Sequence, residues 1–400
     1  MTRFEGRWFT TYGPMDLTQD GNVVRGTYVY RGVPCTIQGT VSDNRLDFEY
    51  QDSEHGVGCF EQTRPGKFAG RWKADAMGHW MDWVGHRGFD GVWDSSFGRL
   101  RLTQQSDRIV GFYEGAGPST IEGTMEGDRF VFRYQEPNVG GEGWFELTGE
   151  GEAFAGEWKP DGGMAFGPWN GTRAKAMSGL TWVLVLEAHW QRSLNENEYS
   201  YGRMVEQVFS RIPGVAVRHR FFDDEASLQR WCRELLYFPE PAIVMIASHG
   251  TPEGLNVQGR TIDTKKVVDS LRHAENLKLL HFSACLVMKE EQTGDFLRRI
   301  QGKAPFPISG YTTAVDWGAS AVLEFQYLDM MLSKGLTPEQ AAEQLPRILK
   351  YAGDEIPPGS PYSPAGFRFV SPHSDGSTLA PSPLPEFAPD DLSSLGRIFC

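Results

Sequence analysis

The first 173 residues contain one pattern twice, and this repeat limits what the amino-terminal half of the chain can fold into. The motif FEGRW at residues 4–8 returns as FDGVW at residues 89–93, and FAGRW at residues 68–72 returns as FAGEW at residues 154–158. The offset stays between 84 and 86 positions (123 − 39 = 84, 158 − 72 = 86). Self-similarity at a fixed period indicates two copies of one structural unit.

Both copies have the pattern of short antiparallel strands. Residues 46–50 (LDFEY) and 130–134 (FVFRY) alternate apolar and polar side chains, as half-buried strands do. Turn dipeptides such as Asp-Gly and Asp-Asn separate these segments. Because each copy has its own set of about six to eight strands, we expect two separate barrels, at residues 1–87 and 88–173. Each barrel resembles the small lipocalin-like barrels of bacterial proteins.

The repeat places large aromatic residues at matching positions in the two barrels. These residues are Trp8, Trp72, Trp93 and Trp158. Large rings dominate protein cores, so the first hypothesis is that they fill the barrel interiors. The alternative is an aromatic-lined cavity that binds a small ligand or a peptide. Trp80 and Trp83 lie in a segment with the composition of a loop, so we expect these two rings to be exposed for contact.

A change of pattern marks a further domain after a short linker at residues 174–179. Apolar runs typical of strands buried on both faces of a parallel sheet occur at residues 181–186, 242–247 and 277–282. Segments with helical patterns occur at residues 201–212, 225–236, 261–274 and 319–332. We therefore predict a multidomain chain in which all-β antiparallel repeats precede an α/β three-layer domain at residues 180–370. The Pro- and Ser-rich residues 371–400 are expected to form a flexible tail.

The second and third apolar runs end in reactive residues. Ser-His-Gly (residues 248–250) follows one, and Ser-Ala-Cys (residues 283–285) follows the other. The carboxyl ends of neighbouring parallel strands meet at one edge of a sheet, so we expect His249 and Cys285 to lie side by side. A neutral imidazole beside a thiol can take its proton, and the thiolate is the nucleophile. The backbone N–H groups of Gly250 and Cys285 are the expected donors of an oxyanion hole.

Either residue alone is weak support for an active site. A lone Cys after an apolar strand is usually a small buried hydrophobe, and a lone His is usually a polar residue of the surface or the core. Together, at the ends of neighbouring predicted strands and flanked by small residues, they favour catalysis. The sequence identifies no clear third catalytic side chain.

The segments around His249 and Cys285 resemble the caspase-like cysteine peptidases, which have the caspase-haemoglobinase fold, and especially their CHAT branch. The likeness covers residues 180–370, about half of the chain. In that branch a Gly-containing strand, an Asp and a long helix follow the Cys strand. Here FPISGY at residues 306–311 and VDW at residues 315–317 take the first two places. The chain has Ser-Ala-Cys-Leu where caspases have Gln-Ala-Cys before a Gly, so a caspase-type preference for Asp does not follow.

The resemblance implies a Cys-His dyad that works without a third residue. It also implies that Asp316 stands where the family builds its substrate pocket, with Trp317 and Ser283 as further substrate-binding residues. A carboxylate in that pocket selects Arg or Lys before the scissile bond. The alternative for Asp316 is a helix N-cap before residues 318–332, and both roles can hold together.

The composition limits the classes of partner that the protein is expected to bind. The formal net charge of −13 argues against nucleic acid and against an anionic membrane surface. No stretch approaches the roughly 20 apolar residues of a membrane span, and the amino terminus has no apolar signal region. The five cysteines are scattered without metal-ligand spacing, so we expect no metal and no cofactor. A reducing cytoplasm would keep the Cys285 side chain a free thiol that is available for catalysis.

The sequence therefore predicts a cysteine endopeptidase that cleaves proteins or peptides after Arg or Lys. The barrels would act as a sensor or recruitment module for an activating protein or a small ligand, in a bacterial regulatory or defence context. Two alternatives remain open. One is a catalytically silent caspase-like scaffold whose barrels bind a partner, and the other is a different Cys-His acyl hydrolase on a similar sheet.

Overall fold

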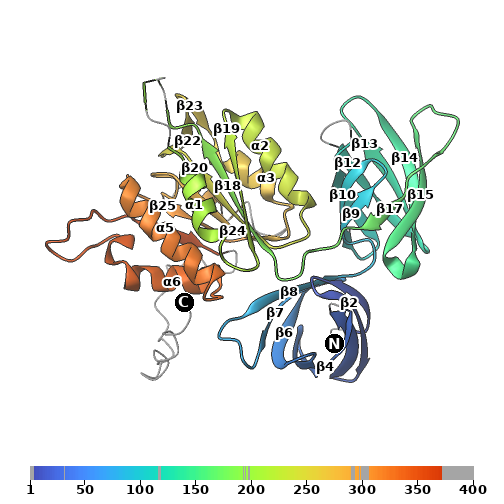
Figure 1. Cartoon of the computed structure of the whole chain (residues 1–400). Helices are drawn as coiled ribbons and strands as arrows, with labels where there is room; N and C mark the ends of the chain where they lie inside the picture. Colours follow the sequence, from blue (N-terminus) through green and yellow to red (C-terminus); the bar gives the residue numbers. More distant parts are fainter. Residues whose placement is uncertain are drawn as a thin grey trace.

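The structure is a computed structural model that describes residues 4–371 apart from residues 31, 116–118, 192, 194, 197–198, 290–292, 297 and 299–305. Within these residues the chain forms two β-barrels, followed by a mixed β-sheet that carries helices on both faces (Figure 1). Of the predicted tail, residues 372–400 lie outside the described residues.

Barrel 1 is a closed meander in which each strand pairs antiparallel with the next along the chain. Its strands are β1 (Gly6–Thr10), β2 (Gly13–Asp20), β3 (Val23–Tyr30), β4 (Val33–Ser42), β5 (Arg45–Gln51), β6 (His55–Arg64), β7 (Lys67–Ala74) and β8 (Met81–His86). The last strand returns to the first, with Phe9 opposite His86 and Thr10 opposite Gly85. Closure removes the exposed edges that an open sheet would present.

Barrel 2 repeats this arrangement. Its strands are β9 (Gly91–Ser95), β10 (Gly98–Gln105), β11 (Arg108–Tyr113), β12 (Ser119–Glu126), β13 (Arg129–Gln135), β14 (Gly140–Thr148), β15 (Ala153–Pro160), β16 (Gly167–Pro168) and β17 (Gly171–Arg173). The ring closes because β14 pairs with β15, and both β15 and β9 pair with β17. The prediction of two separate antiparallel barrels is confirmed.

Aromatic side chains fill both barrels. The four repeated rings all belong to or pack against the barrel cores: Trp8, Trp72, Trp93 and Trp158. Trp83 and Trp169 are each 2% exposed and contact several further rings edge-on. The expectation that Trp83 is exposed is wrong, because it lies on β8, where strand alternation turns it inward. Trp80 precedes β8 and is half-buried. The rings occupy the interior space that a ligand cavity would need.

The carboxyl-terminal sheet has the strand order β19-β18-β20-β24-β25-β26. Its strands are β18 (Thr181–Ala188), β19 (Val215–Phe222), β20 (Ala242–Ala247), β24 (Leu277–Ser283), β25 (Ile308–Tyr311) and β26 (Phe367–Val370). Neighbouring strands are parallel except at β26, which is antiparallel at the edge. The three apolar runs are confirmed as strands β18, β20 and β24.

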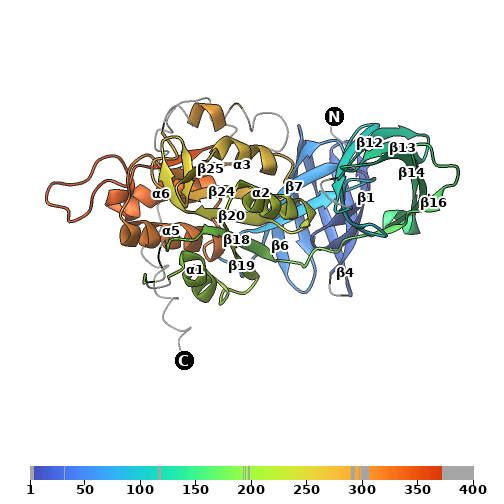
Figure 2. The ribbon, with the colours of Figure 1, turned by 90° about the horizontal axis from the view of Figure 1, so that it is seen from above.

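Helices cover both faces of this sheet, as Figure 2 shows from above. They are α1 (Tyr201–Phe209), α2 (Glu225–Glu234), α3 (Thr264–Leu271), α5 (Trp317–Leu332) and α6 (Pro338–Ile348). The apolar sides of α2 and α3 pack into the core on one face, and those of α1, α5 and α6 pack into the core on the other. Asp224, Asp263 and Thr337 cap the starts of α2, α3 and α6 through side-chain oxygens. In the described part of the chain no helix is both long and apolar enough to cross a membrane.

One segment differs from the sequence prediction. A small antiparallel sheet lies between β20 and α3, and its strands are β21 (His249–Thr251), β22 (Gly254–Val257) and β23 (Arg260–Ile262). The helix predicted at residues 261–274 therefore begins later, at Thr264. Strands of three or four residues are too short to show a clear alternating pattern in the sequence.

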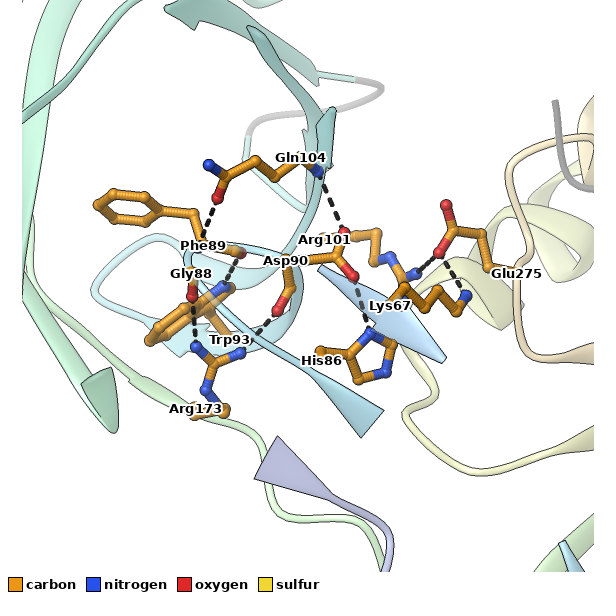
Figure 3. A network of polar contacts seen from close by, with 10 residues as sticks. All are labelled: Lys67, His86, Gly88, Phe89, Asp90, Trp93, Arg101, Gln104, Arg173 and Glu275. Atoms are coloured by element: carbon orange, nitrogen blue, oxygen red, sulfur yellow. Dashed lines mark hydrogen bonds and ion pairs between the residues drawn. The ribbon is translucent and has the colours of Figure 1, made fainter. Parts of the chain in front are cut away.

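Glu275, two residues before β24, joins the sheet domain to both barrels (Figure 3). Its Oε2 accepts hydrogen bonds from Lys67 Nζ of barrel 1 at 2.5 Å and from Arg101 Nη2 of barrel 2 at 2.7 Å. All three side chains are largely buried. Lys278 of β24 also pairs with Asp82 of barrel 1. Both barrels therefore contact the edge of the sheet where its parallel strands begin.

A second polar cluster joins the two barrels to each other (Figure 3). His86 Nδ1 lies 2.7 Å from Asp90 Oδ2, and burial lowers the pKa of His86 to about 4, so this imidazole is neutral near pH 7. Arg173 Nη1 donates to Asp90 O at 2.6 Å. The Arg173 guanidinium also lies 4.2 Å from the ring centroids of Phe9 and Trp93. One cation is thus shared by an aromatic ring from each barrel.

We predict that Glu275→Gln lowers the free energy of unfolding by about 3 kcal/mol. The substitution removes the negative charge that Lys67 and Arg101 share, while both cations stay buried. Urea denaturation followed by tryptophan fluorescence measures the change.

The matched control is Glu122→Gln. Its ion pair with Arg108 is exposed, with 64% of each side chain accessible. Breaking such a pair costs at most about 1 kcal/mol. If the two variants were equally stable, the shared charge at Glu275 would contribute no more than an exposed pair.

Candidate active site

Pairing between β20 and β24 brings the two reactive segments together. The register sets Ala247 opposite Ser283. His249 and Cys285 each follow two positions later, at the edge of the sheet where the parallel strands end, here called the carboxyl edge. Gly250 lies directly against Cys285, because a Cβ on Gly250 would overlap Cys285 O and stand 2.8 Å from Cys285 N. The structure therefore places the segment containing His249 and Gly250 beside Cys285.

His249 begins β21, and its side chain is exposed. The backbone around it is fixed by Ser248, whose N–H donates to Ser283 O at 3.3 Å and whose Oγ donates to His249 O at 2.8 Å. The imidazole packs edge-to-face against Trp190, with ring centroids 5.1 Å apart and an angle of 84° between the planes. An exposed imidazole on a fixed backbone can exchange a proton with a bound substrate.

Cys285 lies in the turn after β24 and is half-buried. Its Sγ lies 3.8 Å from Val315 O, where the thiol can donate a weak hydrogen bond. Leu286 has a φ of 66°, in the left-handed region, and its N–H donates to Thr313 O at 3.1 Å. Holding a branched residue there costs about 1–3 kcal/mol, and such strained residues cluster at functional sites. The backbone directly after the candidate nucleophile is therefore held in an unusual conformation.

Ser283 was predicted to bind substrate, and its hydroxyl donates to Glu324 Oε2 at 3.0 Å. Glu324 lies on α5, is fully buried, and also accepts from Tyr311 OH at 2.8 Å and contacts His281 Nε2 at 3.1 Å. Burial and the neighbouring Glu324 raise the pKa of Tyr311 well above its ordinary value, so Tyr311 remains a hydroxyl donor. This cluster links β24 and β25 to α5 near the end of β24, the strand that precedes Cys285.

Asp316 and Trp317 lie at the start of α5. Asp316 is the N-cap residue, and its Oδ1 accepts from Ala319 N–H at 3.0 Å, so the capping contact expected for it is present. The Asp316 side chain is nevertheless exposed toward solvent. Trp317 is 41% exposed and packs edge-on against Tyr199, with centroids 5.7 Å apart. The role of Asp316 and Trp317 in a substrate pocket stays a prediction.

Sequence reasoning missed Glu187, Trp190 and Glu324, which form the surroundings of the candidate pair. A signal was available for the two acids. Glu187 directly follows the apolar run VLVL, and Glu324 stands between two apolar residues of a mostly apolar helix. A charge buried without partners is very costly, so an acid in such a place implies donors folded around it. For Trp190 the sequence alone holds no comparable signal.

The described residues contain no group of three or more His, Cys, Asp or Glu side chains arranged to hold a metal ion. No protein-family model matches the chain, and no curated protein is similar to it. The solved structures that share a partial likeness with this chain include two at 13% identity. The agglutinin from Burkholderia oklahomensis has a TM-score of 0.12 over 40% of this chain and 82% of that chain. A Trp-176-Ala mutant of transferrin-binding protein B from Haemophilus parasuis has a TM-score of 0.16 over 42% of this chain and 44% of that chain.

We predict that Gly250→Ala destabilises the protein by about 1–3 kcal/mol, because the new methyl group has to displace the Cys285 backbone. Thermal or urea unfolding measures the loss. Gly353→Ala is the matched control in the same domain, since a Cβ there meets nothing within 4 Å. A Gly250→Ala variant as stable as the Gly353→Ala variant would contradict the close approach of the two segments.

Proposed function

We propose that this protein is a cysteine endopeptidase whose residues 180–370 form a caspase-like, CHAT-type domain. The observation that carries the proposal is the position of His249 and Gly250 beside Cys285, at the carboxyl edge of two paired parallel strands. Ligands of open α/β sheets bind at this edge. The strand order β19-β18-β20-β24-β25-β26 and the helices on both faces are compatible with such a domain.

In the proposed reaction His249 takes the proton of the Cys285 thiol, and the thiolate attacks the carbonyl carbon of the scissile peptide bond. The carbonyl π bond opens to an oxyanion, the C–N bond then breaks, and the leaving amine takes the proton from His249. The resulting thioester on Cys285 is hydrolysed by a water molecule that gives a proton to His249. The carboxylic acid leaves, and the sulfur regains its proton from His249.

The proposed oxyanion donors are the N–H groups of Gly250 and Cys285. Fixed backbone donors need no reorganisation when charge develops, which makes them effective stabilisers of the transition state. The close packing of Gly250 on the Cys285 backbone and the left-handed Leu286 support a rigid backbone at this point. The Ser283 hydroxyl donates to Glu324, so this residue would hold the end of β24 in place rather than exchange a proton with substrate.

The barrels are proposed to act as a sensor or recruitment module for an activating protein, a small ligand or the protein substrate. They contact the sheet edge where the strands begin, through Glu275 and Lys278, at the opposite end of the strands from the carboxyl edge. The bacterial regulatory or defence context of this proposal rests on the CHAT resemblance. The proposed location is cytoplasmic, because a reducing compartment keeps Cys285 a thiol.

A second candidate function is a catalytically silent caspase-like scaffold with partner-binding barrels. The contact of Cys285 Sγ with Val315 O at 3.8 Å favours it, because this contact engages the thiol with a backbone carbonyl. The same contact also fits a resting peptidase that substrate or an activator has yet to rearrange. Chemical labelling of Cys285 distinguishes the two.

We predict that Cys285→Ala and His249→Ala each reduce cleavage of a peptide library by about 10³-fold or more while the fold, measured by circular dichroism, is kept. Cys59→Ala is the control, since Cys59 is a half-buried thiol of barrel 1. Full activity in Cys285→Ala would overturn the peptidase proposal. Faster hydrolysis of esters than of matched peptides by the wild type would instead favour the acyl hydrolase.

A peptidyl electrophile should label Cys285 and spare the other described cysteines. Burial raises the pKa of Cys232 to about 12 and also raises the pKa values of Cys35 and Cys59, so these three thiols stay protonated near neutral pH. Mass spectrometry of the labelled protein gives the site. Absence of labelling at Cys285 would favour the silent scaffold.

For specificity, we predict cleavage after Arg or Lys and assign the preference to the charge of Asp316. Asp316→Asn keeps a good N-cap residue but removes the charge, so stability should hold while the preference for Arg over Leu falls by about 10²-fold. Values of kcat/KM for matched peptides ending in Arg, Lys, Asp and Leu measure the effect. Asp263→Asn, the same change at the cap of α3, is the control. A wild-type preference for Asp or Leu, or an unchanged Arg preference in Asp316→Asn, would leave Asp316 as a helix cap alone.

A further inference from the structure

Trp190 lies between a buried carboxylate and the imidazole of the candidate pair. Its side chain is 8% exposed, and its ring packs at 84° against His249 with centroids 5.1 Å apart. We propose that Trp190, held by Glu187, is a positioning residue that fixes the plane of the His249 imidazole. This inference rests on the proposed peptidase function, and it identifies how the chain orients the general base of that site.

The indole is held by a hydrogen bond from Trp190 Nε1 to Glu187 Oε1 at 2.5 Å. Glu187 is fully buried at the end of β18. Burial alone would raise the pKa of Glu187, but contacts from His219, Ser200 and Trp190 outweigh burial and lower it. Glu187 is therefore an anion near pH 7, and a charged acceptor gives the indole N–H a stronger and more directional partner than a neutral one.

Glu187 is itself held by several elements at once. Ser200 Oγ donates to Oε2 at 2.5 Å, and the N–H groups of Tyr201 and Gly202 donate to Oε1 and Oε2 at 2.7 and 2.9 Å. These two N–H groups belong to the first turn of α1, where the helix dipole favours an anion. His219 Nε2 of β19 lies 2.7 Å from Oε2. The carboxylate belongs to β18 and contacts residues of β19 and α1, so three secondary-structure elements together fix the position of the indole.

A fixed ring packed against His249 limits the rotation of the imidazole about its χ2 bond. Aromatic pairs prefer an edge-to-face arrangement, so the indole favours one orientation of the imidazole plane. This orientation matters because a general base works only when its nitrogen points at the proton that it takes. In Ser-His-Asp enzymes a carboxylate orients the imidazole directly. Here the carboxylate of Glu187 would act indirectly, because it holds the Trp190 indole that packs against the imidazole.

The test compares Trp190→Leu, Trp190→Phe and the wild type in two measurements. The first is kcat and KM on one peptide substrate. The second is the rate at which iodoacetamide alkylates Cys285 at pH 6, where an ordinary thiol is almost entirely protonated and only a thiol activated by a correctly placed imidazole reacts quickly. We expect Trp190→Leu to lower both kcat and the alkylation rate by about tenfold with KM within about twofold of the wild type, and Trp190→Phe to recover part of both.

Trp182→Leu is the matched control. Trp182 lies on the same strand, β18, is 7% exposed, and donates from Nε1 to the buried Glu240 at 3.1 Å, but it lies at the end of the strand away from His249. We expect this variant to lose stability and to keep the alkylation rate of Cys285. Equal losses of kcat in Trp182→Leu and Trp190→Leu, or wild-type values of kcat and alkylation in Trp190→Leu, would overturn the positioning role.

The same data separate this inference from the proposed function. If the wild type alkylates no faster at Cys285 than His249→Ala does, the dyad itself is absent, and both proposals fall. If the wild type is faster than His249→Ala while Trp190→Leu matches the wild type, the dyad stands and the role of Trp190 falls.

Discussion

The parallel pairing of β20 with β24 is the constraint on which the candidate site depends. Ala242 pairs with Leu277, but Ile243 pairs with Leu279, so β24 carries one extra residue near its start. That residue is Lys278, which also pairs with Asp82 of barrel 1. Because a slip of one residue changes which side chains face each other along two strands, this bulge sets the alignment at the far end. With this bulge Ala247 lies opposite Ser283, and the segments that carry His249 and Cys285 continue from this pair.

Buried carboxylates hold the domain together around that pairing. Glu187 joins β18, β19 and α1, and Glu324 joins β24, β25 and α5. Glu240 accepts from Met177 N–H of the linker, and Glu275 accepts from both barrels. Each acid sits where several elements converge and receives donors from more than one of them. A buried charge with many donors tolerates little displacement, since any lost contact leaves it poorly solvated.

The two edges of the sheet at which the parallel strands begin and end have different surroundings. The edge where the parallel strands begin is covered by the barrels, through the contacts of Glu275 and Lys278. The carboxyl edge carries His249, Cys285 and the start of α5, with exposed aromatic rings beside them. A rigid strand, β24, runs from one edge to the other. Strand β24 therefore connects the residues that contact the barrels, Glu275 and Lys278, to the candidate nucleophile Cys285.

The sequence by itself determined the repeat, the two separate barrels and the strands β18, β20 and β24, because hydrophobic periodicity depends on neighbours along the chain. It also identified His249 and Cys285 as candidates, since both lie within three residues of the end of an apolar run. Only the tertiary structure decided that Trp83 points into barrel 1, that short strands follow His249, and that Trp190 packs on the imidazole. It also decided the partners of Glu187, Glu275 and Glu324. These contacts join residues far apart in the sequence, and which distant donor meets a buried acid follows from strand register and packing, which no local pattern encodes.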